Sequence, residues 1–235
     1  MTTYKTGSKI GDIVWSLPFV CENGGADIMY LYPNGEFTQA NYEYVKPLLE
    51  AQPYIKEVKL WNNESFDINL DEFVQHAHRG TNLVECFFTV FNKQFDRGHI
   101  HTHPHLFVET IELPKNRSIL ISRGAMMHKN GFRDDFNPHI KGFFDRGLNE
   151  VGFFVGHPQE HEDFCKTYNC NIPHVVVEDA LHTARLINSS KMVITNQTST
   201  SAIAEILKVS LFLEAKINGP DVFDCQFNRP NLWYI

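Results

Sequence analysis

The sequence has no apolar run that approaches the ~20 residues of a membrane-spanning helix, so no integral membrane segment is expected. It has no Cys-x-x-Cys pair, and its odd number of cysteines argues against a complete disulfide framework. We expect all five cysteines to be packing residues: Cys21, Cys86, Cys165, Cys170 and Cys225. No Lys/Arg run exceeds two residues, and a formal net charge of -7 disfavours non-specific binding to nucleic acid. Residues 1–6 lack the apolar core of a secretion signal, so we expect a cytoplasmic location.

The sequence does contain the alternation of short apolar runs and amphipathic stretches that is typical of an α/β protein. Hardly any room is left for a strand before Gly7. In the first half we expect strands at 28–32 and 58–61, and helices at 38–50 and 81–93, the latter capped by Thr81. In the second half we expect strands at 118–122, 152–155, 174–177, 191–195 and 209–213, and helices at 158–168, 180–188 (capped by Asp179) and 199–207.

The count of strands restarts after an irregular segment at 95–104. Two sheets therefore fit the pattern better than one. We predict a first domain at 1–110 and a second at 111–235, which includes a C-terminal tail.

The first candidate site lies at residues 7–18. Gly7 and Gly11 leave a backbone that a ligand can approach closely, and Asp12 opens a helix whose N-terminal amides favour anions. This combination is suited to binding and to proton transfer. The alternative is that the Asp12 carboxylate only caps its helix.

The second candidate site lies at residues 196–205, between a strand and a helix. Ligands of open α/β sheets bind beyond the carboxyl ends of the strands, and here the loop offers amides, hydroxyls and helix-terminal N–H groups. Glu205, one to two turns into the helix, is within reach of the ribose of a bound nucleotide. The alternative is that the Ser/Thr cluster only caps the helix.

Four segments, taken in order, resemble the lipopolysaccharide heptosyltransferases, which are GT-B glycosyltransferases of family 9. They are Gly11-Asp12-Ile13-Val14-Trp15-Ser16-Leu17-Pro18, Phe154-Val155-Gly156-His157-Pro158 with the acidic helix that follows, Ala184-Arg185-Leu186-Ile187, and Asn196-Gln197-Thr198-Ser199 with Ala204-Glu205. The resemblance covers roughly residues 7–215 and is to short members from bacteria and phages. Thr198 and Ser201 stand where many members have glycine and histidine, so the resemblance leaves the donor sugar open.

The resemblance implies two Rossmann-like domains facing across a cleft, and an enzyme that is a hexosyl-, heptosyl- or pentosyltransferase. Asp12 would be the general base that takes the proton of an acceptor hydroxyl. The nucleotide-sugar donor would be held by Arg123, Asn196, Gln197, Thr198, Ser199, Ser201 and Glu205. The acceptor, a cell-surface saccharide or a modified nucleobase of phage DNA, would be held by Ser8, Lys9, Gly11, His101 and His103.

The same resemblance implies that no metal or other cofactor is needed. Enzymes of this fold stabilise the leaving diphosphate with helix N-termini and cationic side chains, and the sequence has no Asp-x-Asp triplet. The guanidinium of Arg123, which follows a strand, can grip two phosphate oxygens. His128, Lys129 and Arg133 are further cationic candidates, for which a solvated surface is the alternative.

The run from His99 to His105 has four histidines at alternating positions. In a strand these imidazoles would share a face and could converge on a divalent metal. The other interpretations are contact with the acceptor and a solvated connector between domains. His76 and His78 are open to the same two interpretations, acceptor contact or surface.

Three other functions compete with a glycosyltransferase. A nucleotide-sugar epimerase of the same architecture would use the donor without an acceptor. A binding protein would hold a nucleotide or sugar without catalysis, and a metal-dependent enzyme would be built around the histidine run.

Overall fold

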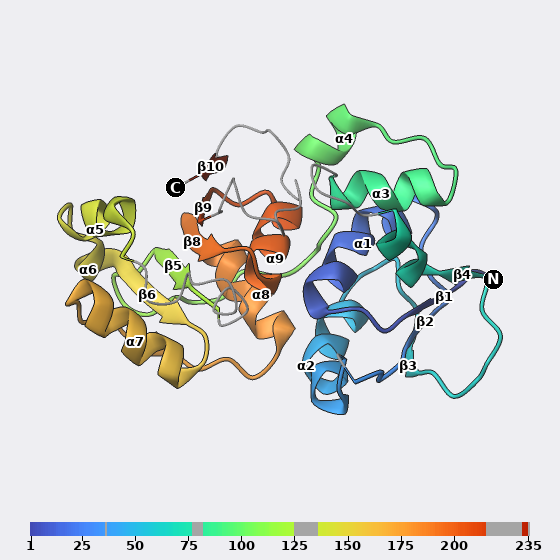
Figure 1. Cartoon of the computed structure of the whole chain (residues 1–235), viewed down its shortest axis with the longest axis horizontal. Coiled ribbons are helices and arrows are strands. Elements are labelled where there is room, and N and C mark those ends of the chain that lie inside the picture. The colour runs from blue at the N-terminus through green and yellow to red at the C-terminus, as the bar shows by residue number, and fades with distance from the viewer. Residues whose placement is uncertain (36, 77–81, 125–135, 215–231, 235) are drawn as a thin grey trace.

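The structure, a computed structural model, describes residues 1–35, 37–76, 82–124, 136–214 and 232–234. The N-terminal half contains a four-stranded parallel sheet with the order β3-β2-β1-β4 (Figure 1). Its strands are β1 (Thr3–Thr6), β2 (Ile28–Leu31), β3 (Val58–Leu60) and β4 (Ile68–Asn69). Although hardly any room for a strand was expected before Gly7, four residues suffice for β1, which lies between β2 and β4.

The helices of this half are α1 (Ile10–Glu22), α2 (Gln39–Glu50), the 3-10 helix η1 (Leu70–Gln75), α3 (Leu83–Val90) and α4 (Arg97–Thr102). The predicted helix at 81–93 is shorter, and its cap is Asn82, whose side chain accepts from the amide of Glu85. The histidine run does not form a strand. Asp96 caps α4 by accepting from the amide of His99, so the first histidines of the run are helical.

The C-terminal half contains a six-stranded parallel sheet with the order β10-β9-β8-β5-β6-β7. Its strands are β5 (Ile119–Ser122), β6 (Gly152–Val155), β7 (His174–Val175), β8 (Met192–Asn196), β9 (Leu211–Glu214) and β10 (Leu232–Tyr234). Five of these strands lie where the apolar runs predict them. The sixth, β10, was not predicted.

The helices of this half are α5 (Pro138–Phe144), α6 (Leu148–Val151), α7 (Pro158–Tyr168), α8 (Ala180–Ser189) and α9 (Ser199–Leu207). Asp179 caps α8 as predicted, through the amide of His182. The two parallel sheets with alternating helices confirm the predicted α/β class with two Rossmann-like units. No helix among the described residues is long and apolar enough to cross a membrane.

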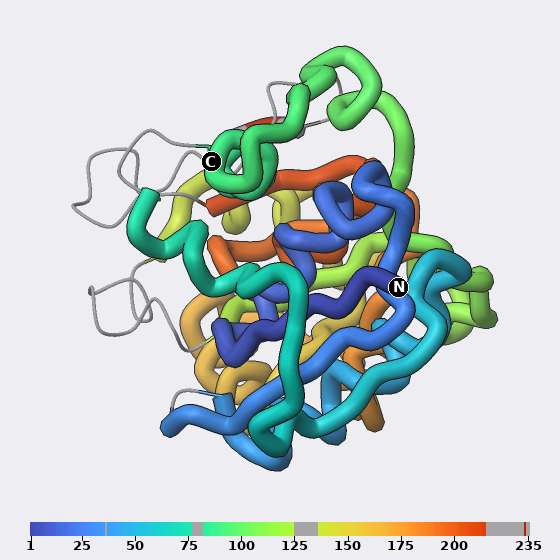
Figure 2. Tube along the Cα trace, turned by 90° about the vertical axis from the view of Figure 1, so that its right-hand side faces the viewer, coloured from blue at the N-terminus to red at the C-terminus, as the bar shows by residue number. Residues whose placement is uncertain are grey.

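The two halves are in direct contact, and Figure 2 looks at the N-terminal half with the C-terminal half behind it. Helix α1 packs against α9, and α2 packs against α8. The Tyr44 hydroxyl of α2 lies 3.0 Å from the Thr183 hydroxyl of α8. Burial is the main reason that the pKa of Tyr44 is raised. One cluster of buried apolar side chains runs through both halves, so they share a core.

The segment that connects the halves is held to each of them in turn. The Tyr54 hydroxyl donates to the carbonyl of His105, at 2.7 Å. The amide of His105 donates to the carbonyl of Ile206, near the end of α9, at 3.3 Å. Further along, the amide of Ile111 donates to the Ser189 hydroxyl of α8, at 2.7 Å. The connection is therefore part of the packed structure.

Candidate functional site

The turn between β1 and α1 is fixed by one carboxylate. Asp71 of η1 accepts hydrogen bonds from the Thr6 hydroxyl at 2.7 Å, the Gly7 amide at 3.0 Å and the Ser8 hydroxyl at 2.7 Å. The Asn34 side chain donates to the Gly7 carbonyl at 2.8 Å. Asp71 was not among the predicted site residues, since it comes from a distant part of the chain. Asp71 holds in place Ser8, which was predicted to contact the sugar acceptor.

Gly7 has a structural requirement of its own. A Cβ built on it would lie 2.5 Å from the ring of Tyr32, closer than real side chains approach. The turn therefore requires glycine at this position.

Asp12 lies in the first turn of α1, partly exposed, and Lys9 is the exposed N-cap residue of that helix. Gly11, beside Asp12, faces the start of α9 in the other half. A Cβ on Gly11 would lie 3.8 Å from the amide nitrogen and from the Cα of Ser199. The N-termini of α1 and α9 therefore meet, and Asp12 lies at their junction.

The carboxyl ends of the central strands of the second sheet form the other side of this junction. Ser122 at the end of β5 is in register with Thr195 of β8. One residue further, the Asn196 side chain accepts from the Gly124 amide at 3.1 Å and donates to the Gly124 carbonyl at 3.0 Å. Asn196, a predicted donor contact, thus ties two strand-end loops together with both of its polar atoms.

The loop ends in a capping box at the start of α9. The Thr198 amide donates to the Ser201 hydroxyl at 3.1 Å, and the Thr198 side chain accepts from the Ser201 amide. A Cβ on Gly124 would lie 2.9 Å from the Thr198 methyl, so glycine allows the two loops to approach. The Ser/Thr cluster can cap the helix and bind a ligand at the same time. The cap uses Thr198 and Ser201, while the amide of Ser199 faces Gly11.

Arg123 is placed at the end of β5 but is turned toward a carboxylate. Its Nε and a terminal nitrogen lie 2.7 and 2.8 Å from the two oxygens of Glu214, at the end of β9. Both side chains are buried, with 8% and 5% of their surfaces exposed. The Asn137 side chain donates to the same Glu214 at 3.2 Å. Contact of Arg123 with a phosphate stays a prediction.

Two further predicted donor residues differ in exposure. Gln197 is partly exposed in the loop before α9. Glu205 is 0% exposed on α9. A ribose would reach the Glu205 carboxylate only after the surrounding side chains moved, so its contact with a ribose also stays a prediction.

The histidine run lies at the other end of α1. Glu22, the last residue of α1, accepts from His99 and His105, whose Nε2 atoms lie 3.1 and 2.9 Å from one carboxylate oxygen. Ten residues of helix separate Asp12 from Glu22, which corresponds to about 15 Å. His101 and His103 belong to this end, so the structure does not bring them together with Asp12.

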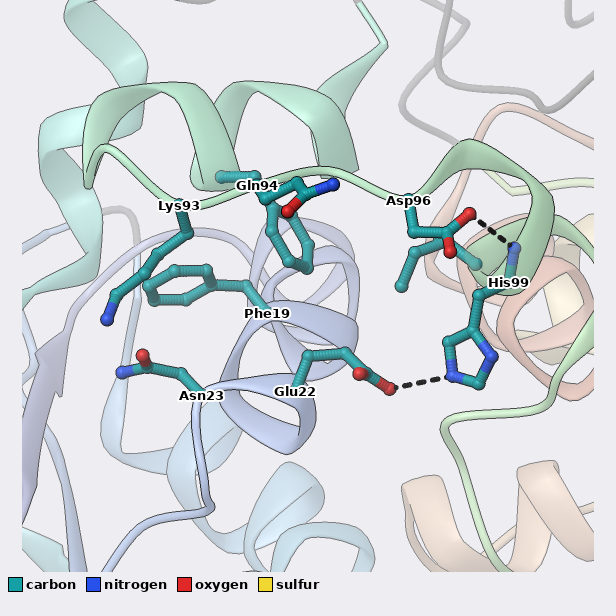
Figure 3. Close-up of a pocket in the computed structure, with 9 residues that line it drawn as sticks. Phe19, Glu22, Asn23, Lys93, Gln94, Asp96 and His99 are labelled. Carbon is teal, nitrogen blue, oxygen red and sulfur yellow. Dashed lines mark hydrogen bonds and ion pairs between the residues drawn. The ribbon is translucent and has the colours of Figure 1, made fainter.

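A pocket of about 200 Å³ opens beside this cluster (Figure 3). Its lining includes Glu22 and His99, with Phe19, Lys93 and Asp96 among the others. Sequence reasoning missed Glu22, because nothing in its local pattern points to residues 99–105.

His105 is 2% exposed. Burial is the largest effect on it and lowers its pKa, while Glu22 acts in the opposite direction and the charges of Lys208 and His99 lower it further. His76 is exposed. The candidates His78, His128, Lys129 and Arg133 lie outside the described residues.

No protein-family model matches the sequence, and no curated protein matches it at a significant level. Solved structures do match. The glycosyl transferase family 9 structure from Veillonella parvula DSM 2008 superimposes with a TM-score of 0.65 at 11% identity, covering 100% of this chain and 85% of the other. The E. coli heptosyltransferase WaaC with ADP gives a TM-score of 0.60 at 11% identity, covering 99% and 92%. The E. coli ADP-heptose lps heptosyltransferase II gives 0.58 at 15% identity, covering 100% and 90%.

This protein has the GT-B fold of the heptosyltransferases. The match extends over the whole chain, which agrees with the resemblance of the four segments. Within this GT-B fold, the predicted residues that lie at the junction of α1 and α9 are Ser8, Lys9, Gly11, Asp12, Asn196, Gln197, Thr198, Ser199 and Ser201.

Proposed function

We propose that this protein is a glycosyltransferase that moves a sugar from a nucleotide-sugar donor to a hydroxyl acceptor, with Asp12 as the general base. The observation that carries the proposal is the junction of two helix N-termini within a GT-B fold. Gly11 of α1 faces the Ser199 amide of α9, and Asp12 lies beside them.

The donor's diphosphate is the group that this junction favours. Helix N-termini carry partial positive charge and N–H groups without intrahelical partners, and here two of them meet. The amide of Ser201 is used by the capping box, which leaves those of Ser199 and Thr200 for phosphate oxygens. Solved structures of the E. coli heptosyltransferase WaaC are with ADP and with ADP-2-deoxy-2-fluoro heptose, so ADP-sugars are the first donors to test.

The reaction needs one proton transfer and one displacement. The Asp12 carboxylate takes the proton of the acceptor hydroxyl, and the hydroxyl oxygen forms a bond to the anomeric carbon of the sugar. The bond from that carbon to the diphosphate oxygen breaks, and its electron pair leaves with the nucleoside diphosphate. Helix N-termini stabilise the charge that develops on the leaving group, so this chemistry proceeds without a metal.

The acceptor enters from the side of Ser8 and Lys9. Asp71 fixes the turn that presents these residues, and Lys9 is exposed. A cell-surface saccharide and a modified nucleobase both offer the hydroxyl that the reaction requires. The charge of -7 favours the saccharide, because it repels a phosphate backbone.

The test is product analysis with a panel of ADP-, UDP- and GDP-sugars and saccharide acceptors, run on the native chain and on Asp12→Asn. The variant keeps the size of the side chain but cannot take a proton. We expect kcat to fall by about 10²- to 10⁴-fold with little change in KM for the donor. Asp145→Asn, an exposed carboxylate on a separate element, is the matched control and should keep full activity.

Three results would contradict the proposal. Release of free sugar without any acceptor product would favour an epimerase or a hydrolase. An unchanged kcat in Asp12→Asn would show that Asp12 is not the general base. Binding of a nucleotide sugar without any turnover would show that the chain is a binding protein and not an enzyme for that sugar.

A further inference from the structure

Two histidines and one glutamate converge at the end of α1 that is remote from Asp12. One ligand atom from each of Glu22, His99 and His105, a carboxylate oxygen and two ring nitrogens, lies within 4.8 Å of the other two. Three donor atoms bound to one metal ion at about 2.0 to 2.1 Å are separated by roughly 3 to 3.5 Å. The separations of the two Nε2 atoms from the Glu22 oxygen, 3.1 and 2.9 Å, are close to this range.

The residues come from three segments that the fold brings together. Glu22 ends α1, His99 lies in α4, and His105 lies in the connection between the halves. The amide of His105 also bonds to the carbonyl of Ile206, near the end of α9. The cluster thus lies where the last turns of α1 and α9 and the connecting segment meet.

Charge at this place favours a cation. The C-terminus of a helix carries partial negative charge, so a carboxylate there is unfavourable unless a positive group is near. Glu22 is the last residue of α1, and the last turn of that helix has no basic side chain, while the positive charge of Lys208 acts on His105. A divalent ion bound to Glu22 would compensate both the carboxylate and the helix end.

The burial of the His105 side chain and its polar contact with Glu22 also favour a bound cation. Its side chain is 2% exposed, and among the described residues its Nδ1 has no hydrogen-bond partner. Its Nε2 therefore makes the one polar contact of a buried imidazole, to Glu22. The Nε2 atom of this buried imidazole is directed at Glu22, and an Nε2 atom beside a carboxylate oxygen is a donor pair that zinc-type ions bind.

The pocket beside the cluster supplies room for the remaining ligands. Glu22 and His99 both line it, and Figure 3 shows their side chains directed at each other. Three protein ligands with an open side suit a zinc-type ion whose coordination is completed by water. Asp96 also lines the pocket, with one oxygen on the His99 amide.

We propose that Glu22, His99 and His105 bind one divalent first-row transition metal ion of the zinc type, which fastens α4 and the connecting segment to the end of α1. The site is separate from the proposed reaction centre, since α1 places Asp12 about 15 Å away. Its role is to hold the junction of the two halves together.

The experiment uses the full chain without a histidine tag, stripped with a chelator and then titrated with Zn²⁺ by calorimetry. Co²⁺ replaces Zn²⁺ in a second titration, because its visible absorption reports the coordination. We expect one ion per chain, together with a rise in Tm, because the ion binds only the folded state.

The informative variants are Glu22→Gln and His99→Gln, whose side chains are partly exposed. Both should weaken Zn²⁺ binding by more than the ~10- to 100-fold that outer-shell changes cause, and should abolish the rise in Tm. His103→Gln is the matched control. His103 stacks on His99 with ring centroids 4.2 Å apart, but it is not one of the three ligands, and the variant should bind like the native chain.

His105→Gln is not used, since a buried substitution can unfold the chain. The proposal is overturned if the stripped chain takes up no Zn²⁺, or if Glu22→Gln and His99→Gln bind as tightly as the native chain. It is also overturned if His103→Gln loses binding as fully as His99→Gln. None of these outcomes depends on sugar transfer.

Discussion

Gly11 in the first turn of α1 faces the backbone of Ser199, the first residue of α9. The side chain that Gly11 lacks would begin 3.8 Å from the Ser199 amide nitrogen, at ordinary van der Waals distance. A methyl group therefore fits here without forcing the halves apart. It would nevertheless occupy space beside the amide that we assign to the donor's diphosphate, so the functional and structural roles of Gly11 can be separated.

We predict that Gly11→Ala keeps the fold and loses activity. Alanine is a better helix former than glycine by about 0.5 to 1 kcal/mol, so the free energy of unfolding should stay constant or rise by that amount. We expect kcat/KM to fall about tenfold or more, which is ~1.4 kcal/mol of transition-state stabilisation. Urea unfolding and steady-state kinetics check the two parts.

The control for this variant is Gly142→Ala in α5. Apart from its chain neighbours and its own helix backbone, no heavy atom of the described residues lies within 4 Å of a Cβ at that position, so the change should affect stability in the same direction and leave activity intact. Full activity in Gly11→Ala would show that the space beside Ser199 is not used by a ligand.

Asp71 provides a second prediction, on the turn that carries Ser8. Asp71→Ala removes the acceptor of three hydrogen bonds, from Thr6, Gly7 and Ser8. Leaving these donors unpaired should lower the free energy of unfolding by about 1 to 3 kcal/mol. The loosened turn should also raise KM for the acceptor more than KM for the donor.

Asp145→Ala serves as the comparison for Asp71→Ala. Asp145 pairs with Lys141 on the surface of α5, and removing an exposed ion pair should change stability by less than about 0.5 kcal/mol. Equal destabilisation by the two substitutions would contradict the role given to Asp71.

Local signals predicted much of the fold. Three helices begin where expected, and each start is marked by a local residue. These are Pro158 at the first position of α7, Asp179 as the cap of α8 and Thr198 before α9. The segment at 95–104 was expected to be irregular, but Arg97–Thr102 forms the short helix α4, whose cap Asp96 lies outside the run from His99 to His105.

The site was less predictable because its contacts join distant segments. The bond between Asp71 and Ser8 spans 63 residues, and that between Glu22 and His105 spans 83. In neither pair does the local sequence around one residue indicate that the other residue will contact it. The family-like segments at 11–18 and 196–205 each include a helix start, and the structure has α1 and α9 beginning there, whereas the roles of Asp12 and Ser199 stay predictions.

The pair of Arg123 and Glu214 can be tested by a double-mutant cycle. Both side chains are nearly buried and joined by two contacts, so Arg123→Met or Glu214→Leu alone removes one half of a buried ion pair. Each single change should destabilise the protein by about 3 to 5 kcal/mol, and the double variant by much less. Urea unfolding measures the cycle.

The exposed pair of Lys46 and Glu50 is the control, and a cycle on it should give a coupling within ~0.5 kcal/mol. A donor-binding role for Arg123 would appear in the double variant, as a higher KM for the nucleotide sugar at restored stability. Single variants that are as stable as the native chain would contradict the buried ion pair.

The thiols provide a prediction with a defined pH dependence. Burial, with a smaller contribution from Glu22, raises the pKa of Cys21 to about 11. Burial and the neighbouring Cys165 raise the pKa of Cys170 to about 12. The thiolate is the reactive form, so at pH 8 only about 10⁻³ of Cys21 and 10⁻⁴ of Cys170 is reactive in the folded chain.

We therefore expect iodoacetamide to alkylate Cys21 and Cys170 slowly at pH 8, and about tenfold faster for each unit of pH up to their pKa values. In the chain unfolded by urea both should react at the rate of an ordinary thiol, with a pKa of about 8.5. Because the folded chain keeps these protons to a higher pH than the unfolded chain does, stability should fall as pH rises above the unfolded value. Mass spectrometry of each peptide measures the rates, and rapid labelling of native Cys21 at pH 8 would contradict a half-buried, protonated thiol.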